Sequence, residues 1–483
     1  MNNLYIKPIN FIGKERDEIN VNSDISVPEF SVIDYKSDMK IIFQKDSLKL
    51  LLVDQKTLSI LEQLKNDKNY NIPLEQLASL LNNGLIIYKS ESSQACKQDS
   101  SNNKLRKIFL HISHDCNLRC GYCYAEGGNY GGKSQLMSFE TAVKAIEYVL
   151  SLDPEIKKLT IEFFGGEPFL NYKTIESMIN YIEEEFPNIN FEYGCVTNAT
   201  IMNDEIENML KKHKFHVMVT IDGPKDYHDL QRTYPDGTGS FETVLSNIPK
   251  FKKSANYLCA RIVYTKKNID LFKIFKYIYE ELGIEDISYR PVMTDNLEYK
   301  IDEESENIAI STLCDCFDYF VEKKFGDMRI ESKFFSEMLL NLIQRKVKKN
   351  FCDFGRFASI TPEGDIYPCT HFVYNEQYKI GNIYKENIDK ELINKCIESS
   401  KANYEPCKSC WILGLCAGGC KGSAAFYNNN EIFINDEYCN TRYKIAEKAM
   451  IKIADLYLED KLEEITNKLI DAESQKISPN RWR

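Results

Sequence analysis

The chain has 483 residues, 43% of them hydrophobic, which is enough for two or three domains with real cores. Its net charge of -11 argues against a general nucleic-acid-binding protein, because neutralising phosphates requires clustered Lys and Arg. No apolar run approaches the roughly 18 residues needed to span a bilayer, and the first residues lack a signal-peptide pattern. We therefore expect a cytoplasmic protein with no membrane partner, in which 16 cysteines are better explained by metal than by disulfides.

Residues 1 to about 95 are expected to form a separate unit, bounded by a polar stretch at residues 90–104 that is expected to be a linker. The pattern predicts paired strands at 39–43 and 49–53, helices at 57–64 and 73–81, and a last strand at 85–88. Strands followed by short helices indicate a winged-helix-like module. Such modules often bind DNA, but residues 74–81 contain no Lys or Arg, which argues against a recognition helix here.

Three cysteines, Cys116, Cys120 and Cys123, follow in a C-x3-C-x2-C arrangement. They supply three thiolates, so a 4Fe-4S cluster bound here would keep one iron open. A zinc site or a disulfide loop is the alternative for three close cysteines.

A second motif lies about forty residues further on, where a predicted buried strand at 159–164 leads directly into Gly165-Gly166-Glu167-Pro168. The two glycines let the main chain approach a ligand, and Pro168 removes a backbone donor that would need a partner.

From residue 107 to residue 292 the chain alternates strand-like and helix-like stretches, as successive βα units do. The predicted strands are residues 108–112, 159–164, 191–197, 215–221, 258–264 and 287–291. Amphipathic helices are predicted between them, for example at 139–150 and 271–282. Six units indicate an α/β fold with an incomplete barrel. Ligands of parallel α/β folds sit at the carboxyl ends of the strands, where both motifs fall.

The two motifs, together with Tyr122 just before the third cysteine, resemble those of the radical S-adenosylmethionine (radical SAM) enzymes. The resemblance implies a partial (β/α)6 barrel over residues 105–325 that binds S-adenosylmethionine on the open iron. Residues 165–168 would hold its methionine amino group. In this family, reductive cleavage of the cofactor yields a 5'-deoxyadenosyl radical, and the protein's task is to place and shield it.

Other strand ends are expected to contact S-adenosylmethionine. Asn198, Thr220 and Asp222 would reach the ribose and the methionine carboxylate, and Arg261 would pair with that carboxylate. The alternative is that Asn198 and Asp222 cap turns or the following helices.

A second set of cysteines lies in residues 345–445 and resembles the complete seven-cysteine SPASM pattern, which includes Gly364. The resemblance implies two auxiliary 4Fe-4S clusters, for three clusters in all. The inner one, nearer the active site, would use Cys352, Cys369 and Cys420. The outer one would use Cys407, Cys410, Cys416 and Cys439. Spacing alone leaves zinc open, because C-x2-C also suits a tetrahedral zinc ion.

The inner cluster would have an open iron, since no cysteine lies shortly before Cys352. A substrate thiolate could bind there, unless Cys314 or Cys316 closes the site. The remaining cysteines are assigned to the core (Cys195 and Cys259) or to no role (Cys96 and Cys396).

The N-terminal module resembles the peptide-recognition domains of enzymes that mature ribosomally made peptides. Such domains bind a leader peptide as an added strand and deliver the core peptide at high effective concentration. The whole chain is similar to sactipeptide and ranthipeptide maturases, which join a cysteine sulfur to carbon. The resemblance implies a precursor peptide as partner and an electron donor such as flavodoxin or ferredoxin.

Three other functions stay open at this stage: a carbon-carbon crosslink, a formylglycine-type oxidation, and a zinc-dependent regulator. Formylglycine-forming enzymes have an Asp base directly after the cysteine that corresponds to Cys369, whereas this chain has Thr370. Residues 446–483 are expected to form a C-terminal helix and tail, and the amphipathic stretch 443–469 indicates a packing role.

Overall fold

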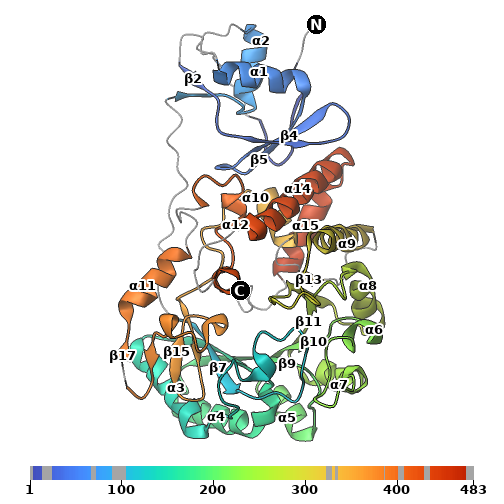
Figure 1. The fold of residues 1–483 in the computed structure, drawn as a ribbon. Helices are drawn as coiled ribbons and strands as arrows, with labels where there is room; N and C mark the ends of the chain where they lie inside the picture. The colour runs from blue at the N-terminus through green and yellow to red at the C-terminus, as the bar shows by residue number, and fades with distance from the viewer. Residues whose placement is uncertain are drawn as a thin grey trace.

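The computed structural model describes residues 4–13, 24–66, 72–89, 105–322, 329–331, 335–385, 387–400, 407–428 and 436–474. Figure 1 shows an N-terminal module above, a large α/β unit below, and a helical C-terminal part between them. The predicted linker at residues 90–104, which includes Cys96, lies outside the described residues.

The N-terminal module is a four-stranded antiparallel sheet with two helices. Its strand order is β1-β5-β4-β3, and β2 pairs separately with β6. The elements are β1 (Ile6–Pro8), β2 (Ile25–Ser26), β3 (Ser31–Asp34), β4 (Met39–Gln44), β5 (Lys49–Asp54), α1 (Gln55–Asn66), α2 (Leu74–Asn82) and β6 (Ile87–Tyr88). The predicted strand pair and both helices are present, while the last strand pairs with β2 outside the main sheet.

The central unit is built on parallel strands with helices between them. Its elements are β7 (Lys107–Ser113), α3 (Phe139–Leu152), β8 (Lys158–Gly165), α4 (Tyr172–Glu185), β9 (Asn190–Thr197), α5 (Asp204–Lys212), β10 (His216–Thr220), α6 (Lys225–His228), α7 (Phe241–Ser254), β11 (Tyr257–Tyr264), α8 (Leu271–Lys276), β12 (Asp286–Pro291), α9 (Glu303–Glu322) and β13 (Arg329–Glu331). All six predicted strands are present as β7 to β12, in consecutive parallel order. The predicted helix at 271–282 is α8 followed by a π-helical turn, Tyr277–Glu281.

The cysteine-rich part extends this sheet instead of forming a detached unit. Strand β14 (Phe357–Ile360) pairs in parallel with β7, and β15 (Asp365–Tyr367), β16 (Gly381–Asn382) and β17 (Asn387–Ile388) follow in antiparallel order. Within the described residues the sheet therefore has 11 strands, with β13 at one end and β17 at the other. Because β14 covers the edge of β7, the backbone groups of that edge are paired.

The C-terminal helices lie over the mouth of the barrel, at the carboxyl ends of its strands, except for the helix Lys390–Ser399, which lies at the side near β15 and β17 (Figure 1). They are α10 (Phe335–Gln344), α11 (Lys390–Ser399), α12 (Leu413–Cys416), α13 (Lys421–Tyr427), α14 (Asp436–Leu458) and α15 (Leu462–Ser474). The prediction of a single helix at 443–469 is wrong in one respect, because the structure has two helices there, α14 and α15, with a break between them. Asp460 adopts a φ of 54°, and the amide of Lys461 donates to the Leu456 carbonyl at 2.9 Å, which ends the first helix.

The N-terminal module contacts the C-terminal part directly. The rings of Phe43 and Trp411 meet edge to face at 6.0 Å, and Trp411 stacks on Tyr443 at 5.6 Å. The Tyr35 hydroxyl donates to Asp455 of α14 at 2.6 Å. These contacts join the module to the segment that carries the outer cysteines.

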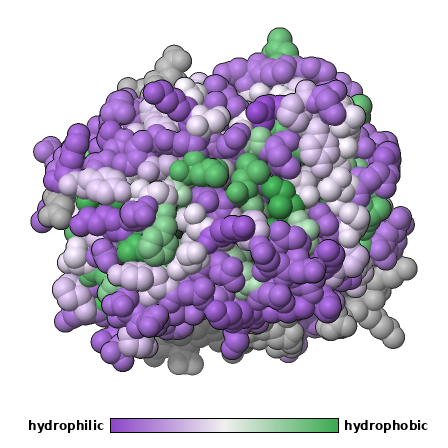
Figure 2. Space-filling view, turned by 90° about the horizontal axis from the view of Figure 1, so that it is seen from below, coloured by the Kyte–Doolittle hydropathy of each residue, from purple (hydrophilic) through white to green (hydrophobic). Residues whose placement is uncertain are grey.

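Seen from below, the molecular surface is mainly hydrophilic, with apolar side chains gathered in a band near the middle of that face (Figure 2). Of the described helices, none is long and apolar enough to cross a membrane.

Candidate active site

The loop that carries the first three cysteines leaves the carboxyl end of β7 and is fixed on two sides. The amides of Gly166 and Glu167 donate to the carbonyls of Ser113 and Asp115, both at 2.8 Å. Further along, the amide of Arg119 donates to the Thr233 carbonyl at 2.7 Å. The loop is thus held between the end of β8 and the segment that follows β10.

The two glycines of the second motif are required by this close approach. Gly165 has a φ of 132°, and a Cβ on it would lie 2.0 Å from the Ser113 carbonyl oxygen. A Cβ on Gly166 would lie 2.2 Å from the Asp115 carbonyl oxygen. The sequence suggested that these glycines make room for a ligand, and the structure shows that they also make room for the cysteine loop.

Replacing Gly166 with alanine is therefore expected to displace the cysteine loop. Backbone atoms oppose the new Cβ, so the loop must move, and we expect loss of most cluster iron and a fall in stability of about 2 kcal/mol or more. Iron content after anaerobic reconstitution and thermal unfolding would measure both effects. Gly237→Ala is the control for iron content, since no atom lies within 4 Å of an added Cβ there, and any loss of stability in it reflects the φ of 86° alone. Equal iron in both variants would contradict the steric argument.

Glu167 is fully buried, and its carboxylate has hydrogen-bond donors within the protein. Its carboxylate accepts from the Asn198 amide at 2.7 Å, the Thr197 hydroxyl at 2.8 Å and the Phe169 amide at 3.0 Å. Burial raises the pKa of this carboxyl to about 7, and the three donors act in the opposite direction. Pro168 lies at the start of the 3-10 turn that Glu167 caps. The motif thus joins the ends of β8 and β9.

Asn198 connects the end of β9 to the cysteine loop. Its amide nitrogen donates to the Asn117 side-chain oxygen at 2.9 Å and lies 3.6 Å from the Cys116 sulfur. Its oxygen accepts from the amide and hydroxyl of Thr200. The predicted turn-capping role of Asn198 is therefore present, and the same side chain also contacts a cysteine of the loop.

A buried charged network supports Tyr122. The tyrosine hydroxyl donates to Asp222 at 2.6 Å and accepts from Arg232 at 2.7 Å, while Gln231 also donates to Asp222. The Val263 amide donates to the other carboxylate oxygen at 2.9 Å. Burial raises the pKa of Asp222, and the Arg232 guanidinium counteracts this rise. Asp222 therefore positions the aromatic residue beside Cys123, a role that the sequence did not suggest.

Thr220 and Arg261 are paired in register on β10 and β11, near the mouth of the barrel. The Arg261 guanidinium lies 3.7 Å from the Met218 sulfur and lowers the pKa of His371, where burial is the main cause. Arg261 thus lies near the segment that follows Cys369. Binding of S-adenosylmethionine by Thr220, Asp222 and Arg261 stays a prediction.

The three thiols of the first motif suit an iron-sulfur cluster. Burial raises the pKa of Cys116 to about 12 and that of Cys120 to about 11, and the Cys123 thiol also raises both. Thiols that resist ionisation in this way need a nearby cation to become thiolates. Iron in a cluster supplies that charge, and thiolates are its usual protein ligands.

The seven cysteines of the second motif separate into two groups in space. Cys352 and Cys420 both raise the pKa of Cys369, after burial, which raises it to about 12. In the other group, Cys416 raises the pKa of both Cys407 and Cys410 in addition to burial. Burial raises the pKa of Tyr443, and Cys410, Cys416 and Cys439 raise it further. This grouping agrees with the inner and outer ligand sets that the resemblance implies. The role of each thiol as a ligand stays a prediction.

The two cysteines considered as closing ligands of the inner set face elsewhere. Cys316 is 1% exposed and lies against the Leu271 carbonyl at 3.7 Å. The charged groups that affect the pKa of Cys314 are Lys452 and Lys448 of α14 and the acidic residues Asp318 and Asp315, and no inner-set thiol is among them. Neither cysteine joins Cys352, Cys369 and Cys420 in the described structure. Cys195 and Cys259 are fully buried, as predicted for core residues.

A cavity of about 140 Å³ lies between the first cysteine loop and the inner set. Tyr124, next to Cys123, and His371, two residues after Cys369, both line it, and their rings are in contact with centroids 5.0 Å apart. Tyr130 contacts Tyr124 at 5.9 Å, and Met293 lines another wall. The His371 Nδ1 is buried with no hydrogen-bond partner within the described residues.

Sequence reasoning missed these cavity residues. Their signal was adjacency, since Tyr124 and His371 each lie within two residues of a predicted ligand.

Comparison with known proteins agrees with this geometry. The model of the radical SAM superfamily matches residues 110–271, and the model of the SPASM iron-sulfur cluster-binding domain matches residues 352–411. An uncharacterized protein of Methanocaldococcus jannaschii is 31% identical over 267 residues, which are 55% of this chain and 85% of the relative. The chain belongs to the radical SAM enzymes with a SPASM domain. It has the α/β fold of that family, and S-adenosylmethionine and iron-sulfur clusters are its cofactors.

Relatives with named activities include a cyclopropyl synthase and sulfatase-maturating enzymes. The radical SAM cyclopropyl synthase TigE of Paramaledivibacter caminithermalis is 23% identical over 390 residues, 77% of this chain and 79% of TigE. The cysteine-type anaerobic sulfatase-maturating enzyme of Clostridium novyi is 28% identical over 344 residues, 66% of this chain and 88% of that enzyme.

Two solved structures share the fold. Native anSMEcpe with bound AdoMet has a TM-score of 0.62 at 22% identity and covers 73% of this chain and 99% of its own. Streptococcus suis SuiB bound to the precursor peptide SuiA has a TM-score of 0.50 at 16% identity and covers 86% of this chain and 98% of its own.

Proposed function

We propose that this enzyme matures a ribosomally made peptide by joining a cysteine sulfur to a carbon atom. The observation that carries this proposal is the cavity between the two cysteine sites, closed by the contact of Tyr124 with His371. A side chain held there has the radical-generating loop on one side and the inner three-cysteine set on the other.

The expected reaction balances as a two-hydrogen oxidation of the peptide. The cofactors bound to the enzyme would supply a 5'-deoxyadenosyl radical and an acceptor for one electron. One hydrogen atom leaves the peptide carbon and is found in 5'-deoxyadenosine, the thiol proton leaves to solvent, and one carbon-sulfur bond forms. An external reductant supplies the electron that starts each turnover. The chain's own task is to hold the carbon between Tyr124 and Met293 and to exclude water.

The inner set offers a place for the substrate thiol. Cys352, Cys369 and Cys420 provide three thiols, and neither Cys314 nor Cys316 joins them among the described residues. A 4Fe-4S cluster held by three cysteines keeps one iron open for another ligand. A cysteine of the peptide is a suitable fourth ligand, since thiolate is the ligand that such iron prefers.

The N-terminal module is proposed to bind the leader peptide at the edge strand β3. Strand β3 pairs with β4 on one side, and its other edge ends the sheet. Val32 in this strand is 40% exposed, so an added strand could cover it. SuiB, which has the same overall fold, was solved with its precursor peptide bound.

A carbon-carbon bond is the second candidate, because TigE is a cyclopropyl synthase and resembles this chain over most of its length. Formylglycine formation is less favoured. Thr370 stands where those enzymes are expected to have an Asp base, and its hydroxyl is 4.0 Å from the Cys369 sulfur.

The test is anaerobic incubation of the reconstituted enzyme with a cysteine-containing precursor peptide, S-adenosylmethionine and dithionite. We expect a peptide lighter by two hydrogens, a thiol that no longer reacts with iodoacetamide, and formation of 5'-deoxyadenosine. Mass spectrometry and chromatography measure these three quantities. If the peptide loses two hydrogens while every thiol still reacts, the thioether proposal fails and the carbon-carbon bond replaces it.

A further inference from the structure

A second cavity, of about 130 Å³, lies beside the one between the cysteine sites. Met293 lines both cavities, and helix α13 forms the wall between them. Gly422 and Phe426 of this helix face the first cavity, while Ser423 and Tyr427 face the second. A peptide residue placed in the first cavity would therefore have a neighbouring side chain within reach of the second.

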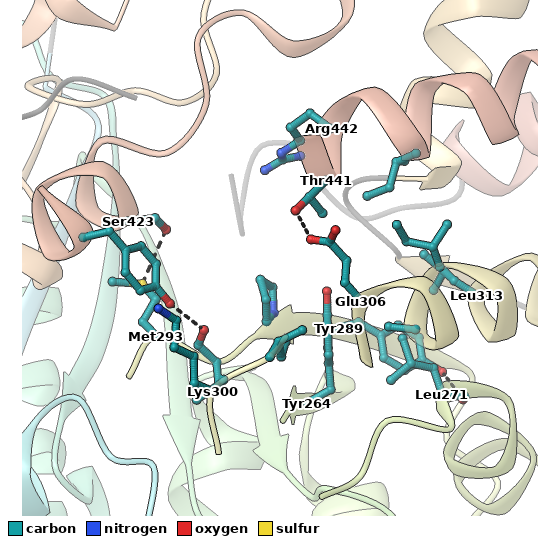
Figure 3. Close-up of a pocket in the computed structure, with 17 residues that line it drawn as sticks. Tyr264, Leu271, Tyr289, Met293, Lys300, Glu306, Leu313, Ser423, Thr441 and Arg442 are labelled. Atoms are coloured by element: carbon teal, nitrogen blue, oxygen red, sulfur yellow. Dashed lines mark hydrogen bonds between the residues drawn. The ribbon is translucent and has the colours of Figure 1, made fainter. Parts of the chain in front are cut away.

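The second cavity lies among three parts of the chain (Figure 3). Its floor is the ends of β11 and β12, one side is α9, and α13 and α14 close it above. Most of its wall is apolar, with Leu271, Ile310 and Leu313 among the lining side chains. Apolar cavities of this kind favour an apolar occupant over water.

Most polar side chains at the wall, which include Lys300 and Arg442, have partners within the protein. Glu306 accepts from the Thr441 hydroxyl and from Lys444, and the Tyr289 hydroxyl donates to the Leu271 carbonyl at 3.2 Å. The Tyr264 hydroxyl points into the hollow (Figure 3) and has no hydrogen-bond partner among the described residues. An apolar pocket with one uncommitted donor is typical of a site that binds an apolar group and orients it by a hydrogen bond.

The size and lining of the cavity favour an aromatic ring. An engineered apolar cavity of about 150 Å³ is known to bind benzene, so 130 Å³ suits a single ring. Three tyrosine rings line the pocket, and they offer edge-to-face contacts. The Met293 sulfur and the Arg442 guanidinium are also partners that aromatic rings prefer.

We propose that this cavity binds an aromatic side chain of the substrate peptide, next to the residue that is modified. It would set which core sequences the enzyme accepts, with the Tyr264 hydroxyl donating to a backbone carbonyl of the peptide. This inference rests on the proposed function, since it assumes a peptide substrate.

The first experiment measures binding of N-acetyl-L-phenylalaninamide to the reconstituted enzyme by calorimetry. We expect binding, with no binding of N-acetyl-L-aspartamide. Ala309 is 4% exposed and lines the cavity from α9, so Ala309→Phe should fill it and weaken binding at least tenfold. Ile308 lies on the same helix but is 41% exposed, and Ile308→Phe should leave binding within twofold of the wild type.

A second variant tests the pocket by enlargement. Ile310→Ala should strengthen binding of N-acetyl-L-tryptophanamide relative to the phenylalanine probe by at least fivefold. This variant tests the pocket even if the Ala309→Phe protein does not fold. Equal binding of the phenylalanine and aspartate probes, or no effect of either pocket variant, would overturn the proposal. Probe binding together with failure to modify any peptide would overturn the proposed function instead and leave an aromatic-binding pocket.

Discussion

Cys120→Ala is expected to reduce 5'-deoxyadenosine formation by at least about 1000-fold, since loss of a mere supporting contact to a metal ligand already costs 10 to 100-fold. Cys120 is one of only three protein ligands expected for the radical-generating cluster, and the other two cannot hold the cluster firmly. We expect the reconstituted variant to contain about four iron atoms fewer than the wild type. Iron analysis and chromatography of the nucleoside products measure the two effects.

The matched control for this prediction is Cys259→Ala. Cys259 lies in β11, is fully buried, and its thiol faces the neighbouring Ala260 carbonyl at 3.5 Å. Its loss should lower stability by about 1–2 kcal/mol through the small cavity that it leaves, with iron content and nucleoside formation near the wild-type values. If both variants lose iron equally, the loss would reflect general unfolding, and the assignment of Cys120 as a ligand would not stand.

Much of the central fold could be predicted because its determinants are local. Apolar runs such as residues 159–164 are followed by helical patterns, and each predicted strand lies within about two residues of the observed one. The inner and outer grouping of cysteines came from a family pattern of fixed spacings and stays a prediction. The effects of these thiols on one another's pKa agree with it.

What could not be predicted depends on contacts between distant segments. Pairing of β14 with β7 joins residues about 250 positions apart, and no local pattern encodes such a partner. The meeting of Tyr124 with His371 has the same origin. Sequence reasoning also treated Gly166 only as a residue that approaches a ligand, because the opposing Asp115 carbonyl belongs to another loop.

The break between α14 and α15 was missed for a different reason. Residues 443–469 keep an amphipathic pattern through the break, so periodicity alone gives one helix. The interruption depends on the backbone of one residue, Asp460, in the left-handed region, which aspartate tolerates better than most residues do.

Cys352→Ala is expected to separate radical formation from bond formation. Cys352 belongs to the inner set with Cys369 and Cys420 and is not part of the first cysteine loop, which is expected to bind S-adenosylmethionine. The variant should still form 5'-deoxyadenosine, within about tenfold of the wild type, while the crosslinked peptide falls by at least about 100-fold. Mass spectrometry of the peptide and chromatography of the nucleoside, taken from the same reaction, give the ratio of the two products.

The control for Cys352→Ala is Cys396→Ala, because the two cysteines share a neighbourhood but differ in expected role. Cys396 is 1% exposed and packs in the small apolar cluster of Phe354 and Phe372, against which Cys352 also packs. The charged groups that affect Cys396 are Lys395 and Asp389, and no inner-set thiol is among them. Removing it should leave iron and crosslinking near wild type. Normal crosslinking by Cys352→Ala would show that the bond forms without the inner site, and the proposed binding of the substrate thiol there would be wrong.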